Sequence, residues 1–217
     1  MRTIVVAVAG ALACLQWLGR TYGSTPEERR RPMPGDELVR HPQTVANHAV
    51  TIPAPPEQVW PWLVQVGWHR GGWYTARWVD ALLFPDNRPS ADRVLPQYQR
   101  LEVGDFVPDG PPSSECGFVV HDVRTAEHLV LASSSHLPLT WRQRGLAGVW
   151  WTWAFVLTPV DTASGPGTRL LFRWRARTRP WWLTVGAAAL VVPADFVMSR
   201  DMLRGIRRRA ATRRPGP

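Results

Sequence analysis

The sequence feature that most constrains the fold is a long helical segment near the C-terminus. An apolar run, residues 181–192, is followed by Pro193 and then by apolar residues at every fourth position from Met198 to Ile206. Residues four apart share one face of an α-helix, and arginines occupy another face of this one. Pro193 lacks an amide donor and disfavours helix at the preceding residue, so we expect a bend there. The pattern predicts one long amphipathic helix that begins near Pro180 and lies against another layer of structure.

The residues before this helix have the period of a β-strand. Leu170, Phe172 and Trp174 alternate with arginines, which gives one apolar and one cationic face. Further strands are expected at residues 47–52, 101–107, 117–123, 128–133, 149–160 and 168–177, with two short helices at 57–66 and 75–84. This order predicts an α+β fold in which a curved antiparallel sheet wraps around the terminal helix. We expect a cavity between the helix and the sheet, because side chains rarely fill such a space completely.

The N-terminal segment is apolar but short. Residues 4–18 would form a helix about 22 Å long, less than the roughly 30 Å of a bilayer core. Three interpretations remain open: a membrane anchor, a cleaved signal peptide with small residues near Cys14, or a buried helix. For an anchor, the arginines that follow favour a cytoplasmic domain. The alternatives are a secreted protein or a soluble cytoplasmic one.

Composition suggests how the chain is divided. Residues 1–20 are the anchor or signal-like segment, 21–44 a proline-rich linker, 45–211 the folded domain, and 212–217 a basic tail with proline. Much of the net charge of +9 lies near the C-terminus, where residues 200–217 hold seven arginines and one aspartate. The nearly neutral domain excludes a broad nucleic-acid surface. Residues 4–18 and the arginine-rich tail are instead candidates for contact with a membrane surface.

Motifs for common chemistry are absent from the sequence. There is no glycine-rich phosphate loop, nucleophile elbow or metalloprotease helix, and the two cysteines suggest neither a disulfide framework nor zinc. We therefore expect no metal and no cofactor. The polar run from Ser133 to His136 is interpreted as a turn. If the protein is an enzyme, its candidate proton donors and acceptors are Asp80, Tyr74, Arg93 and His69.

Aromatic residues carry the remaining signal, with 13 tryptophans in the chain. They are spread over the predicted helices and strands, where a subset can line a pocket. The candidate ligand contacts are Trp73, Tyr74, Trp78, Phe118, Trp153, Phe155, Trp174 and Phe196. The adjacent glycines Gly71 and Gly72 suggest a mobile entrance to that pocket.

Several of these stretches resemble one protein superfamily. They are the segment Thr51–Gly67, with its Ala-Pro-Pro-Glu-Gln-Val-Trp core, the Arg70–Tyr74 segment Arg-Gly-Gly-Trp-Tyr, Val103–Asp105, and Phe196–Met198. The chain resembles the SRPBCC superfamily of START, Bet v 1 and polyketide cyclase/dehydrase-like domains. The second and last segments resemble an actinobacterial-type subgroup without assigned chemistry. The resemblance implies a helix-grip fold with a hydrophobic cavity and does not imply a reaction.

Three classes of function are compatible with these observations. The first is binding or transport of a lipophilic small molecule, such as a lipid, an isoprenoid or an aromatic polyketide, between sheet and helix. The second is a polyketide cyclase/dehydrase-like enzyme. The third is a membrane-associated structural or partner-binding protein. Because the candidate acid–base residues have no motif partner, the sequence favours binding without catalysis.

Overall fold

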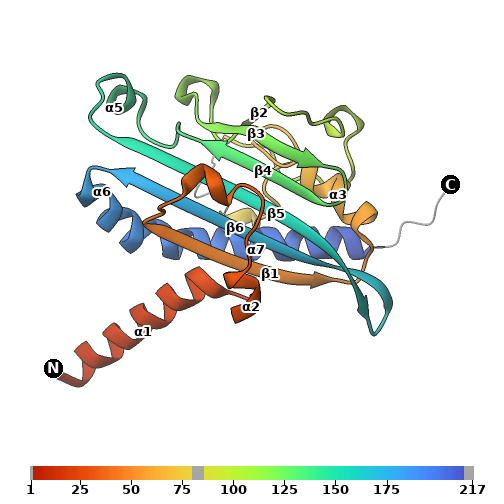
Figure 1. Ribbon diagram of the computed structural model, residues 1–217, viewed down its shortest axis with the longest axis horizontal. Helices are drawn as coiled ribbons and strands as arrows, with labels where there is room; N and C mark the ends of the chain where they lie inside the picture. The colour runs from red at the N-terminus through yellow and green to blue at the C-terminus, as the bar shows by residue number, and fades with distance from the viewer. Residues whose placement is uncertain (1, 80–85, 213–217) are drawn as a thin grey trace.

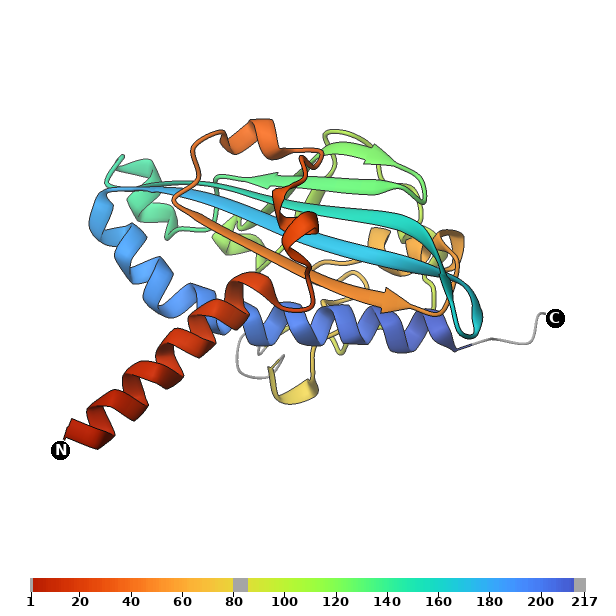
Figure 2. The ribbon, with the colours of Figure 1, turned by 60° about the horizontal axis from the view of Figure 1, so that its bottom comes forward.

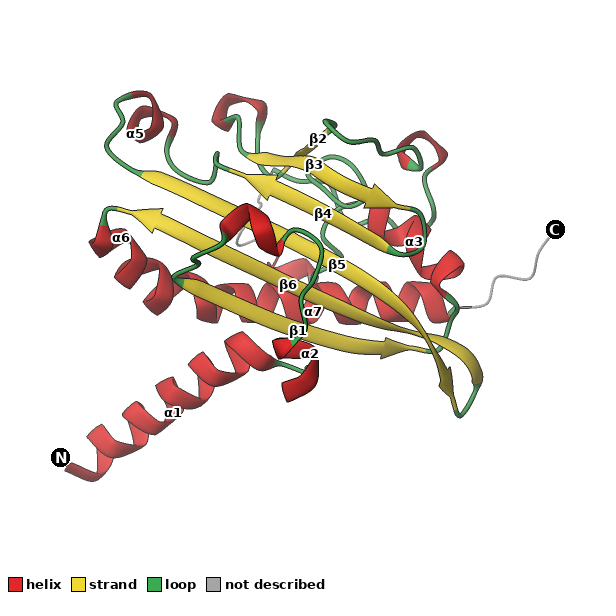
Figure 3. Ribbon diagram, viewed as in Figure 1, coloured by secondary structure: helices red, strands yellow, loops and turns green. Residues whose placement is uncertain are grey.

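The fold is an antiparallel sheet crossed on one face by a long C-terminal helix (Figure 1). The computed structural model describes residues 2–79 and 86–212, with side chains described from residue 10 onward in these ranges. The six strands lie in the order β1-β6-β5-β4-β3-β2, and each pair of neighbours is antiparallel. Figure 3 shows the helices around this sheet. The predicted α+β helix-grip architecture is confirmed.

The strands and helices have the following bounds. The strands are β1 (Thr44–Ile52), β2 (Phe106–Pro108), β3 (Gly117–Arg124), β4 (His128–Ser133), β5 (Gly148–Thr162) and β6 (Gly165–Arg179). The helices are α1 (Arg2–Thr21), α2 (Pro26–Arg30), α3 (Pro56–Val64), α5 (Leu139–Gln143), α6 (Trp181–Gly186) and α7 (Val192–Ala211), with the π-helical segment η4 (Ala187–Val191) between the last two. Short 3-10 turns are η1 (Asp36–Val39), η2 (Pro96–Tyr98) and η3 (Pro112–Ser114). Of the second predicted helix, residues 75 and 76 are not helical, residues 77–79 are helical, and residues 80–84 lie outside the described residues.

One predicted strand, 101–107, is largely wrong. The amide of Asp105 donates to the carbonyl of Glu102 at 3.1 Å, and Gly104 has a φ of 97°. A positive φ suits glycine, and here it belongs to a tight turn. The extended conformation therefore begins only at Phe106.

The β5–β6 hairpin supplies the centre of the core. Trp153 pairs with Trp174 and Phe155 with Phe172 across the two strands, and all four side chains are buried. The rings of Phe155 and Phe172 stack with centroids 4.6 Å apart. These side chains point toward α7, which contributes Met202, Leu203 and Ile206 to the same cluster.

The C-terminal helix bends close to Pro193, as the sequence predicts (Figure 2). Before Pro193 the backbone widens into π-helix, and the amide of Val192 donates to the carbonyl of Ala187. In that register the carbonyl of Ala188 would receive the amide of residue 193, but proline has none. The side-chain amide of Gln16 on α1 donates to this carbonyl at 2.8 Å. The end of α1 is thus attached at the bend.

The cationic face of β6 is covered by the segment between α1 and β1. This segment crosses the outer face of the sheet, opposite α7 (Figure 1), and buries Met33 and Val39 there. Arg173 has a side chain only 4% exposed and uses all five of its N–H groups. They donate to Asn47 Oδ1, Asp36 Oδ2 and the carbonyls of Glu28, Arg29 and Arg31. Arg173 therefore holds the segment on the sheet, together with Arg169 and Arg175, which pair with Glu28 and Asp36.

Replacing this arginine should destabilise the whole domain. Arg173→Met leaves Asn47 Oδ1 and three carbonyls without their donor and removes one of the two arginines that pair with Asp36, so we expect a loss of about 3 kcal/mol in the free energy of unfolding. The measurement is chemical unfolding of the purified full chain. Arg207→Met, on the exposed face of α7, is the matched control and should change little. Equal stability of the two variants would contradict this role for Arg173.

Candidate functional site

A cavity of about 320 Å³ lies between one end of the sheet and the first half of the C-terminal helix. Its helix wall consists of Leu183, Gly186, Ala187, Leu190 and Val191 from α6 and η4. Its sheet wall consists of Thr44, Val149, Trp151, Trp174, Ala176 and Thr178, closed at one end by His136 and Leu137. Nearly all of this lining is apolar, so the cavity suits an apolar ligand.

The cavity exists because the helix and the sheet separate at this end. α7 packs on the sheet, whereas α6, on the other side of the π-helical bend, diverges from the axis of α7 (Figure 2). Small residues line the gap on both walls, with Gly186 and Ala187 on the helix and Ala176 on β6. The large rings of Trp151 and Trp174 form the deeper surface. Leu190 is 74% exposed and also lines the cavity, which places its opening at η4.

A largely buried polar relay stands at one end of the cavity. His136 Nε2 lies 2.9 Å from Asp109 Oδ2, and His136 Nδ1 lies 2.7 Å from Ser133 Oγ. Burial raises the pKa of Asp109, and the hydrogen bond from His136 opposes that rise. Both ring nitrogens are occupied within the protein. His136 therefore presents its ring to the cavity and keeps its proton-transfer atoms on Asp109 and Ser133.

A second buried carboxyl supports the floor of the cavity. Asp195 on α7 accepts a hydrogen bond from the indole N–H of Trp174 at 2.6 Å and from Ser199 Oγ at 3.0 Å. Burial raises the pKa of Asp195 to about 7, although both hydrogen bonds lower it. The carboxyl fixes the orientation of a tryptophan that the cavity exposes to a ligand.

The raised pKa of Asp195 predicts a pH dependence of stability. The fold favours the neutral form of Asp195. Its contribution to the free energy of unfolding is therefore complete below about pH 4 and is lost as the pH rises to about 7. Relative to Asp195→Asn, which keeps an acceptor for Trp174, the wild-type chain should lose roughly 1 kcal/mol per pH unit in that window. Urea unfolding at several pH values measures this difference. Parallel stability curves for the two proteins would show that Asp195 titrates normally.

Most of the aromatic residues singled out in the sequence form the core rather than the cavity wall. Trp174 lines the cavity. Six others are buried in the interior: Trp73, Tyr74, Phe118, Trp153, Phe155 and Phe196. Trp78 is 61% exposed. The cavity therefore lies further toward the start of the C-terminal helix than the distribution of rings suggested.

Of the four candidate acid–base residues, the three that the structure describes do not line the cavity. The hydroxyl of Tyr74 donates to the carbonyl of Trp62 at 2.8 Å, and burial raises its pKa. His69 and Arg93 are exposed, and Asp80 lies outside the described residues.

Gly71 and Gly72, where the sequence suggested an entrance, do not line the cavity. The amide of Gly71 donates to the carbonyl of Gln65 at 2.6 Å. Gly72 has a φ of 75°, and a Cβ atom there would lie 2.6 Å from Ser90 Oγ. These contacts make the segment a packed tight turn.

Sequence reasoning missed Trp151 and the helix wall. Trp151 shares the face of β5 with Trp153 and Phe155, two residues apart each time, so the period of the strand could have identified it. The helix wall lies in the apolar run before Pro193, which was recognised as helix but not as part of a site. No sequence pattern joins Asp109 to His136, because they meet only through the turns of the fold.

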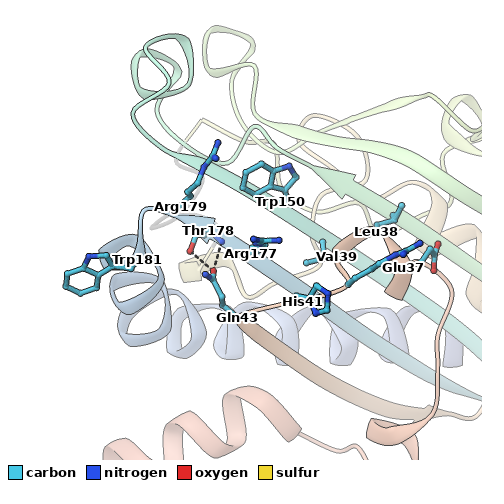
Figure 4. A pocket seen from close by; sticks show the side chains of 11 residues that line it. Glu37, Leu38, Val39, His41, Gln43, Trp150, Arg177, Thr178, Arg179 and Trp181 are labelled. Carbon is cyan, nitrogen blue, oxygen red and sulfur yellow. Dashed lines mark hydrogen bonds between the residues drawn. The ribbon is translucent and has the colours of Figure 1, made fainter.

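A second concave surface lies on the outer face of the sheet (Figure 4). This groove has a volume of about 780 Å³ and separates residues 37–43 from the ends of β5 and β6. Arg40, Arg177 and Arg179 line it, with Trp150 and Trp181 beside them. Thr178 belongs to both the groove and the cavity, so the two sites adjoin at the end of β6.

The C-terminal helix also meets a simple measure for membrane spans. Among the described residues, one helix, Trp181–Ala211, is long and apolar enough to cross a bilayer. Core helices of soluble proteins meet the same measure, and α7 packs against the sheet. Length and composition therefore do not decide between a membrane-associated and a soluble protein.

Comparison with known proteins finds similarity to solved structures only. No protein-family model matches the chain, and no curated protein matches it. Protein MLL2253 from Mesorhizobium loti is 16% identical over 76% of this chain and 98% of its own, with a TM-score of 0.41. Protein CV1439 from Chromobacterium violaceum is 12% identical over 78% and 98%, also with a TM-score of 0.41. DynU16, from the dynemicin biosynthetic locus, is 15% identical over 74% and 46%, with a TM-score of 0.35. Likenesses this distant carry no argument about function.

Proposed function

We propose that this protein binds a lipophilic small molecule in the cavity between the sheet and the α6–η4 segment. The observation that carries the proposal is an apolar cavity of about 320 Å³, within the usual size range of small-molecule sites, that opens beside Leu190. A lipid chain, an isoprenoid or an aromatic polyketide fits this chemistry. The helix-grip architecture and the Ala-Pro-Pro-Glu-Gln-Val-Trp segment support placing the chain in the SRPBCC superfamily.

The cavity offers two kinds of contact to such a ligand. Trp151 and Trp174 present aromatic surface, and Trp174 is held in place by Asp195. Leu183, Leu190 and Val191 present aliphatic surface on the opposite wall. Thr178 also lines the cavity, and its Oγ1 lies 2.7 Å from Thr184 Oγ1, so a ligand hydroxyl or carbonyl can join an existing hydrogen-bonded group. Apolar contact supplies the affinity, and these threonine hydroxyls set the orientation of the ligand.

A second candidate function, cyclase-like proton transfer, rests on the relay of Asp109, His136 and Ser133. A buried carboxylate that orients a histidine is the usual arrangement behind a general base. To exchange a proton directly with a substrate, His136 would have to release Ser133, because Asp109 occupies its other ring nitrogen. Binding without catalysis requires no such rearrangement, and this difference favours the first proposal.

Filling the cavity should abolish ligand binding without unfolding the protein. Ala187→Trp places a large ring in the space that the lining residues leave open, so we expect the affinity for Nile red to fall by at least about tenfold. Ala189→Trp is the matched control, because Ala189 lies in the same helix segment, is exposed and does not line the cavity. A fluorescence titration measures both. Equal binding by the two variants would place the dye elsewhere and contradict the cavity as the site.

The natural ligand can be identified directly. Native mass spectrometry of the full chain purified from its own host should show an added mass, and organic extraction should release an apolar compound. The Ala187→Trp variant should lack that mass, whereas Ala189→Trp should retain it. A host-purified wild-type chain without any added mass would count against a tightly bound ligand.

A further inference from the structure

We propose that the end of the molecule formed by α1, α5 and α6 docks on an anionic phospholipid membrane, with the outer groove of Arg40, Arg177 and Arg179 receiving lipid headgroups. This surface is distinct from the cavity and goes beyond the ligand-binding function. Figures 1 and 2 both show α5 and α6 at the same end of the sheet, with the N-terminal part of α1 projecting on that side.

Large apolar side chains are exposed at this end. Trp181 is 75% exposed and Trp17 is 60% exposed, and Trp182, Val185 and Leu190 are exposed as well. Trp182 contacts Trp141 of α5 edge to face, with centroids 5.9 Å apart, which joins the two helices into one surface. Tryptophan has an apolar body and a polar N–H, and it concentrates at the interface between lipid headgroups and acyl chains.

The groove adds unneutralised positive charge beside these rings. Within the described residues, none of Arg40, Arg177 and Arg179 forms an ion pair, although Arg169, Arg173 and Arg175 on the same face of β6 do. The guanidinium group of Arg179 stacks over the ring of Trp150 at 5.4 Å from its centroid. Figure 4 shows Arg179 and Trp150 near one another on one side of the groove. Guanidinium groups match phosphate oxygens in shape and charge, and Glu37 is the one acidic side chain among the residues that line the groove.

These two features together favour a bilayer. Exposed tryptophan and leucine gain free energy on entering an apolar phase, whereas the neighbouring arginines gain it beside anions, and an anionic membrane surface offers both within a few ångströms. The opening of the cavity at Leu190 lies on the same helix segment. A lipophilic ligand can therefore pass between bilayer and cavity without crossing water.

The test compares binding of the full chain to vesicles of phosphatidylcholine alone and to vesicles that also contain phosphatidylglycerol. The ratio of the two affinities reports anionic selectivity and is independent of any insertion by α1. For Arg177→Gln/Arg179→Gln we expect the ratio to fall roughly 25-fold, since each arginine near an anionic surface contributes about fivefold. Both arginines are exposed, so the fold should be retained.

The matched control removes the same charge away from the groove, the cavity and the arginine-rich C-terminal segment. Arg88→Gln/Arg100→Gln changes two exposed arginines that line neither the groove nor the cavity. This control should keep the wild-type ratio. An equal loss in both double variants, or no loss in either, would overturn the assignment of the groove.

Two further measurements separate this inference from its alternatives. Inorganic phosphate, compared with chloride at equal ionic strength, should not displace the protein from vesicles. Specific displacement would indicate a site for a soluble phosphate and would overturn the membrane assignment. Ala187→Trp should bind vesicles as the wild-type chain does, because it fills the cavity and leaves the groove intact. Loss of vesicle binding in that variant would contradict a docking surface separate from the cavity.

Discussion

The missing amide of Pro193 determines the shape of the end of the molecule that holds the cavity. A helix cannot continue through proline without leaving a carbonyl unpaired, and here the backbone widens to π-helix and leaves the carbonyl of Ala188 open. Gln16 donates to that carbonyl at 2.8 Å and so attaches α1 to the bend. The change of direction separates α6 from the sheet, which creates the cavity and exposes the outer side of α6 to its surroundings.

The two faces of β6 differ in chemistry, one apolar and one cationic, and a different segment of the chain covers each. Phe172 and Trp174 face α7 and complete an apolar core, while Arg169 and Arg173 face the other way. A buried arginine is unfavourable without partners, and the segment after α1 supplies carboxylates and carbonyls that match its donors. Toward the end of the strand this cover stops. Arg177 and Arg179 remain without carboxylate partners among the described residues, and there the groove begins.

The sequence predicted the regular parts of the structure well. The alternation in β6, the hairpin with β5 and the fourfold spacing in α7 each follow from one local period, and all three appear in the fold. The strand predicted at residues 101–107 was mostly wrong, because the turn at Gly104 depends on local hydrogen bonds that hydrophobicity does not report. Of the aromatic residues selected as ligand contacts, Trp174 lines the cavity, because a buried ring looks the same in sequence whether it meets a ligand or another ring.

The sequence alone specified the elements: an apolar helix interrupted by proline, strands with one apolar and one cationic face, and a domain of nearly neutral charge. These properties depend on residues close together in the chain, so local periodicity reveals them. The cavity, the relay of Asp109 with His136, the five partners of Arg173 and the unpaired arginines of the groove were decided by the folded arrangement. Each depends on residues from distant segments, since packing and hydrogen bonding in three dimensions determine which side chains are satisfied and which remain available to a ligand.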